Sequence, residues 1–104
     1  LIITGGYNVY PAEVEGYLND MPGVAESAVI GLPHPDFGEG VVAVVVPKPG
    51  ATPEAAELVA RLKTQIANFK IPKQVFIVPE LPRNTMGKVQ KNLLRDQHKG
   101  LFGA

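Results

Sequence analysis

One lysine in a proline-bounded loop is the clearest candidate for chemistry in this sequence. Lys88 directly follows Gly87, and the surrounding segment 81–91 leads from a predicted loop into a predicted helix. The pattern assigns none of these residues to a hydrophobic core. A flexible ammonium on such a loop can be inserted into a site elsewhere, where it stabilises negative charge on phosphate or carboxylate oxygens. The alternative interpretation is a solvated lysine near the start of a helix.

Two glycines near the start of the chain mark a second candidate region. Gly5 and Gly6 separate two short β-prone runs, an arrangement that favours a tight hairpin because glycine tolerates positive φ. Tyr7 and Tyr10 lie on the second run, where packing and binding explain them equally well.

Charge is balanced over the whole chain but divided along it. Residues 1–60 carry eight acids and one base, whereas residues 61–104 carry nine bases and two acids. This division suggests that the C-terminal segment faces phosphate or carboxylate groups. It is equally consistent with two segments that pair their charges on one solvated surface.

A first helix and two strands are expected after the hairpin. The helix begins at Pro11, which suits a first helical turn, and ends before Pro22-Gly23. Residues 24–32 alternate loosely and predict a strand, whereas residues 41–46 form a continuous apolar run that predicts a strand buried on both faces. The turn-rich segment 33–38 between them is expected to be a loop.

A strand–helix–strand unit follows. Thr52 is expected to cap the second helix and Pro53 to open it, with an apolar stripe that reaches Phe69. A strand over residues 74–78 then pairs in parallel with residues 41–46.

The last helix is expected from Val89 to near Gly100, with Leu93 and Leu94 facing inward and a short mobile tail after it. Together these elements predict one α+β domain over residues 1–104: a small mixed β-sheet flanked by helices, with a separate N-terminal β-hairpin.

Composition excludes several classes of function. With no net charge, the chain is not expected to bind nucleic acid, and without cysteine it cannot form a disulfide. Its longest apolar run is far shorter than the ~18 residues that a membrane span needs, so a cytoplasmic rather than membrane location is expected. His34 has no companion at metal-ligand spacing, which predicts no metal site. The chain begins on a strand-like run without Met, so it is expected to be part of a longer protein.

The lysine loop closely resembles the C-terminal lysine motif of the acyl-adenylate-forming superfamily, which includes acyl-CoA synthetases, peptide-synthetase adenylation domains and luciferases. In that family the loop reads Pro-Arg or Pro-Lys, two or three small polar positions, Gly-Lys, and then a helix with further basic residues. The positions that match this pattern are Pro82-Arg83, Thr85, Gly87-Lys88 and Lys91.

Three further segments resemble the same family in the same order. They are residues 5–15, residues 29–36 with Gly38-Glu39, and residues 69–73. The resemblance implies that the chain is the mobile C-terminal lid domain of an AMP-forming acid–thiol ligase, inactive alone. Its partner would be the large N-terminal domain of the same enzyme, which carries the acid pocket and most of the site for ATP and Mg.

The resemblance further implies that this domain serves two half-reactions by rotating. A carboxylic acid first reacts with ATP to give acyl-adenylate and pyrophosphate, and the thiol of coenzyme A then displaces AMP. Lys88 would be the catalytic residue of the first step, whereas Gly5, Gly6 and Tyr7 would contact CoA in the second. Lys63 lies where some members place a base near the CoA phosphates, and a solvated helix face is the alternative.

Two other expectations concern partners. Relatives are acetylated at the motif lysine, so the resemblance implies that a protein acetyltransferase and a deacetylase act on Lys88. The competing hypothesis is an autonomous adaptor whose basic half holds an acidic protein or RNA. The aromatic residues of that half are scattered rather than interleaved with the bases, which favours the lid domain.

Overall fold

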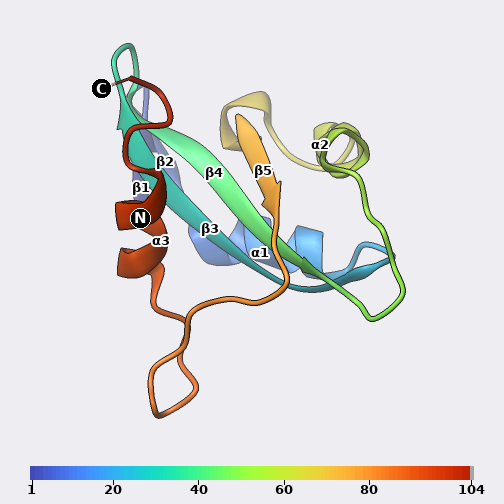
Figure 1. Cartoon of the computed structure of the whole chain (residues 1–104). Helices are drawn as coiled ribbons and strands as arrows, with labels where there is room; N and C mark the ends of the chain where they lie inside the picture. Colours follow the sequence, from blue (N-terminus) through green and yellow to red (C-terminus); the bar gives the residue numbers. More distant parts are fainter. Residues whose placement is uncertain (104) are drawn as a thin grey trace.

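Five strands, three α-helices and one 3-10 turn make up the computed structural model, which describes residues 1–103 (Figure 1). The strands lie in the order β2-β1-β4-β3, with β5 also paired to β4. In chain order the elements are β1 (Ile2–Thr4), β2 (Tyr7–Val9), α1 (Pro11–Asn19), β3 (Val24–His34), β4 (Gly38–Pro47), α2 (Ala55–Lys63), the 3-10 turn η1 (Asn68–Lys70), β5 (Gln74–Ile77) and α3 (Lys91–His98).

Strand β4 holds the sheet together because it pairs with three other strands. It is antiparallel to β3 along the whole hairpin, antiparallel to β1 at Thr4 and Gly38, and parallel to β5. Residues Val41–Val45 are at most 1% exposed. The prediction of a strand buried on both faces, drawn from the continuous apolar run, is therefore confirmed.

Alternate residues of β4 enter two hydrophobic cores on opposite faces of the sheet. Val41, Ala43 and Val45 belong to a first core that also holds the buried faces of α1 and α2. Val42 and Val44 belong to a second core with α3. Figure 1 shows this layering, with α3 in front of the sheet and α1 behind it.

The predicted α+β class and the N-terminal hairpin are both confirmed. Gly5 and Gly6 form its turn with φ of 57° and 85°, the region that glycine adopts without strain. The hairpin is not separate from the sheet as predicted but is joined to it, since Thr4 pairs with Gly38 and the Gly5 N–H donates to the Phe37 carbonyl at 2.9 Å.

The β3–β4 hairpin is longer than the sequence predicted. Its strands run to His34 and start again at Gly38, so only three residues of the expected loop form the turn. The Nδ1 atom of His34 accepts hydrogen bonds from the N–H groups of Asp36 and Phe37. The histidine therefore stabilises this turn, and its side chain pairs with the Phe37 and Phe102 rings.

The predicted ends of the second helix are wrong. α2 begins at Ala55 after an extended Glu54, and no side chain caps it. Pro53 lies instead against the turn at Gly23, within 3.8 Å of the position of a Cβ there. The helix ends at Lys63 because the Thr64 hydroxyl donates to the Arg61 carbonyl at 2.7 Å, a local bond that competes with further helix. Phe69 consequently lies in η1, outside the helix.

The C-terminal helix also differs from its prediction. It starts at Lys91, because Val89 is held extended by a β-bridge to Arg83. Leu94 is buried as expected, whereas Leu93 is 39% exposed. Phe102 packs against the second core and fills the space above Gly40, where a Cβ would lie 2.6 Å from the Phe102 ring. The prediction of a mobile tail after the helix is therefore wrong for the segment up to Phe102.

Within residues 1–103, four ion pairs connect the acidic and basic segments of the chain. They are Glu57–Arg61, Glu13–Lys70, Glu26–Arg83 and Glu15–Lys91. Four of the nine bases after residue 60 are thus neutralised by acids from before it, so charge pairing explains part of the division. Over residues 1–103, no helix is long and apolar enough to cross a bilayer.

Candidate functional site

The Lys88 loop is a narrow protruding loop whose two stems are joined by backbone hydrogen bonds. The Asn84 N–H donates to the Lys88 carbonyl at 3.0 Å, and the Gly87 N–H donates to the Asn84 carbonyl at 2.9 Å. Below this tip, Arg83 and Val89 form an antiparallel bridge, and the Gln90 N–H donates to the Pro82 carbonyl at 2.8 Å. Figure 1 shows the loop protruding from the lower end of the molecule.

The stems of this loop are fixed in the second core. Leu81 is 4% exposed, and Val89 packs against the same cluster together with Leu94. The sequence interpretation that nothing in this segment serves the core is therefore wrong at both stems. Lys88 itself is exposed, and within residues 1–103 its ammonium has no carboxylate partner. The arrangement thus presents a free cation on an anchored support.

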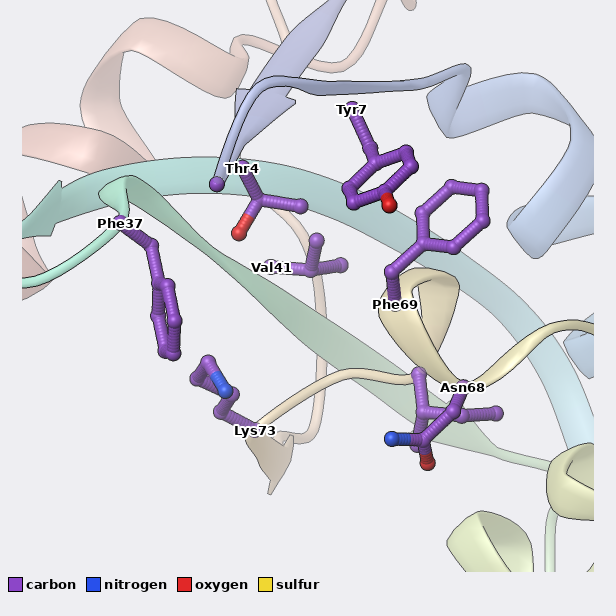
Figure 2. A pocket seen from close by; sticks show the side chains of 9 residues that line it. Thr4, Tyr7, Phe37, Val41, Asn68, Phe69 and Lys73 are labelled. Atoms are coloured by element: carbon purple, nitrogen blue, oxygen red, sulfur yellow. The ribbon is translucent and has the colours of Figure 1, made fainter.

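A pocket of about 260 Å³ lies at the other end of the molecule, beside the N-terminal hairpin (Figure 2). Gly5 and Tyr7, two of the predicted CoA-binding residues, line it together with Phe37, Phe69 and Lys73. The hairpin turn, the tip of the β3–β4 hairpin and η1 therefore meet around one cavity, although they are far apart in the sequence.

Aromatic rings and one ammonium give this pocket its chemical character. The Tyr7 and Phe69 rings stack with centroids 4.7 Å apart, and Figure 2 shows them side by side at the rim. Across the pocket, the Lys73 Nζ lies 4.4 Å from the centroid of the Phe37 ring. Stacked rings accept a flat or apolar group, whereas an exposed ammonium pairs with a phosphate or carboxylate oxygen.

Two predicted CoA-binding residues do not line this pocket. Gly6 completes the hairpin turn but stays outside it, and no atom lies within 4 Å of the position of a Cβ on this residue. Lys63, the last residue of α2, lines an open groove between α2 and β5. Lys73 borders both that groove and the pocket, so it lies between Lys63 and the hairpin.

Sequence reasoning did not assign roles to Phe37, Phe69 and Lys73. Phe69 and Lys73 belong to a segment that carried the family resemblance, which was a usable signal. Phe37 lies within another such segment, between residues 29–36 and Gly38-Glu39, but its approach to Gly5 depends on the β1–β4 pairing, which the segment alone does not reveal. Across residues 1–103, no group of three or more His, Cys, Asp and Glu could hold a metal ion.

Comparison with known proteins gives a consistent result. Residues 13–88 match the family described as AMP-binding enzyme C-terminal domain. The chain is 54% identical over 99 residues to the 3-[(3aS,4S,7aS)-7a-methyl-1,5-dioxo-octahydro-1H-inden-4-yl]propanoyl:CoA ligase of Rhodococcus jostii, covering 95% of this chain and 19% of that protein. It is 47% identical to the indoleacetate–CoA ligase of Aromatoleum aromaticum, covering 91% of this chain and 19% of that one.

A solved structure agrees with these relatives. The crystal structure of ATP-bound MatB from Rhodopseudomonas palustris superposes with a TM-score of 0.95 at 59% identity, over 98% of this chain and 20% of that one. The chain therefore spans about one fifth of the length of the proteins it matches.

Proposed function

The chain belongs to the family of AMP-binding enzyme C-terminal domains, and on that premise we propose that it is the mobile C-terminal part of an AMP-forming acid–CoA ligase. Two observations support this proposal. The relatives are CoA ligases that are about five times as long, which leaves room for a large partner domain. The chain also carries two candidate sites at opposite ends, a free lysine and an aromatic pocket, one for each of the two successive steps described below.

In the proposed first step, Lys88 assists acyl-adenylate formation. A carboxylate oxygen of the acid attacks the α-phosphorus of ATP, and the bond to pyrophosphate breaks. Negative charge is shared among the oxygens of the carboxylate and the α-phosphate as this happens. The Lys88 ammonium aligns and neutralises these oxygens, and losing one such preorganised donor costs ~10²–10³ in rate. ATP and its Mg are held mainly by the partner domain.

In the proposed second step, the pocket beside the hairpin receives coenzyme A. The CoA sulfur attacks the acyl carbonyl, and AMP leaves with the electrons of the acyl–phosphate bond. Gly5 and Tyr7 line this pocket and present a backbone without a side chain and an aromatic face to the pantetheine arm, and Gly6 completes the turn between them and contacts the arm from outside the pocket. Lys73 is better placed than Lys63 to pair with a CoA phosphate, because it shares the pocket with Gly5 and Tyr7.

The proposed acid substrate is malonate. The protein in the apo MatB crystal structure, a malonyl-CoA synthetase, is 60% identical in sequence to this chain. This identity is somewhat above the 54% of the Rhodococcus jostii ligase. The runner-up is another short acyl acid or an aryl acid, because the names of the relatives vary and the acid pocket lies in the partner domain. The proposed substrates ATP and CoA favour a cytoplasmic location.

Lys88 is also the proposed target of a protein acetyltransferase and a deacetylase. Its exposure and its lack of an ion-pair partner in residues 1–103 leave the amine accessible. Acetylation would remove the charge on which the first step depends. The adaptor hypothesis is weakened, since four of its nine bases are engaged in ion pairs; steeply salt-dependent RNA binding would restore it.

The free ammonium of Lys88 on its anchored loop is the observation that carries this proposal, and the test is a Lys88→Ala variant of the intact ligase. We expect pyrophosphate release from malonate and ATP to fall by ~10²–10³-fold. Conversion of preformed malonyl-adenylate and CoA to thioester should stay near normal. Lys99→Ala, which removes an exposed lysine just after α3, is the matched control. Normal pyrophosphate release by Lys88→Ala would contradict the proposal.

A further inference from the structure

The backbone of the Lys88 loop is held by the side chain of one asparagine. The Asn84 Oδ1 accepts hydrogen bonds from the Met86 N–H at 2.9 Å and from the Lys88 N–H at 3.0 Å. The main chain of Asn84 adds a second bond to the same lysine, because its N–H donates to the Lys88 carbonyl. Both backbone polar groups of Lys88 are thus bound to Asn84.

Arg83 connects the tip of the same loop to the sheet. Its Nη1 donates to the Gly87 carbonyl at 2.7 Å, one residue before the lysine. Its Nη2 forms an ion pair with Glu26, which lies on β3 and is 57 residues distant in the sequence. One guanidinium therefore joins the glycine that precedes Lys88 to a strand of the core sheet.

These contacts fix the main chain of Lys88 and leave its side chain free. The loop tip is exposed from Arg83 to Lys88, and none of these residues belongs to either hydrophobic core, so its shape depends on these polar contacts. An ammonium on a loop that changes its backbone conformation would reach the reacting oxygens only part of the time. A misplacement of about 1 Å is enough to cost ~10² in rate.

We propose that Asn84 and Arg83, anchored by Glu26, are positioning residues for Lys88 that set the lysine backbone before the loop enters the partner domain. This inference rests on the proposed role of Lys88 in adenylation. It adds three residues that contact neither ATP nor the acid and act through the lysine alone.

The test measures both half-reactions in variants of the intact ligase. Asn84→Ala removes both side-chain hydrogen bonds and is expected to lower the kcat of adenylation by about 10–10²-fold. The KM values for ATP and acid should change much less, and thioester formation from preformed acyl-adenylate should stay normal. Asn84→Asp keeps an oxygen that accepts the same two N–H groups, so it should restore adenylation to within a few-fold.

Two further variants separate positioning from general stability. Glu26→Gln removes the ionic anchor but leaves the bond from Arg83 to Gly87, so a smaller loss of adenylation is expected. Asn19→Ala removes an asparagine that accepts a hydrogen bond from Ser27 at 2.8 Å, outside the loop, and adenylation should be unchanged.

The outcomes distinguish this inference from the function on which it rests. Normal adenylation by Asn84→Ala, alongside a large loss in Lys88→Ala, overturns the positioning role and leaves the proposed function intact. Equal loss of both half-reactions in Asn84→Ala, or no rescue by Asn84→Asp, also overturns it. Normal adenylation by Lys88→Ala instead removes the premise.

Discussion

Lys73 is the residue whose role depends most on the fold. Its Nζ lies over the Phe37 ring, and it lines the same pocket as Gly5 and Tyr7. The sequence predicted Gly5, Tyr7 and Lys88 because each belongs to a local motif. It could not assign Phe37 or Lys73 to the pocket, because they are brought there by the register of β4 against β1 and β5. Local chemistry could therefore be predicted, whereas contacts between distant segments could not.

Removing the Lys73 ammonium tests the CoA assignment. A hydrogen bond to a charged group contributes about 1.5–3 kcal/mol, so Lys73→Ala in the intact ligase should raise the KM for CoA by roughly 10–10²-fold. Adenylation, measured as the release of pyrophosphate, should be unaffected. If Lys63→Ala raises this KM and Lys73→Ala does not, the assignment from the family resemblance is correct and the pocket is not the phosphate site.

Among the elements, α3 shows what periodicity alone cannot decide. Leu93 and Leu94 are neighbours, and the sequence pattern placed both inward, but a helix turns 100° per residue and buries only one of them fully. The start of the same helix was misplaced for a related reason. A bridge to Arg83, closed by the turn from Asn84 to Gly87, holds Val89 extended, and helical periodicity does not reveal that pairing.

The two leucines form a matched pair for a stability measurement on this chain. Leu94 is 3% exposed and packs in the second core, so Leu94→Ala should lower the free energy of unfolding by about 2–5 kcal/mol. Leu93 is 39% exposed, and Leu93→Ala should cost less than about 1 kcal/mol. Urea denaturation followed by circular dichroism distinguishes them. Equal costs would mean that α3 is rotated about its axis relative to this structure.

At the scale of the whole molecule, the two candidate sites are attached to the same five-stranded sheet. The molecule measures 38 Å along its longest axis, and Figure 1 shows the Lys88 loop and the β3–β4 hairpin tip at opposite ends. The strand β4 passes between them and is buried along its centre. The fold class could be predicted because β4 is visible in the sequence as a continuous apolar run. The placement of the two sites relative to each other could not be predicted.

Separation of the sites predicts that their contributions are independent. A ligase carrying both Lys88→Ala and Lys73→Ala should show the adenylation defect of the first variant and the CoA defect of the second, without further loss in either. Pyrophosphate release and thioester formation from preformed acyl-adenylate, measured separately, give the two numbers. A strong departure from additivity would show that the sites act on one step.

A domain that carries the lysine at one end and the proposed coenzyme pocket at the other cannot bring both to a single cleft at the same moment. Any ligand that binds one orientation more tightly therefore lowers the population of the other orientation. An excess of CoA over ATP should hold the enzyme in the thioester orientation and slow activation of the acid. The spacing of two features on one small domain would then appear in the kinetics as inhibition by a substrate.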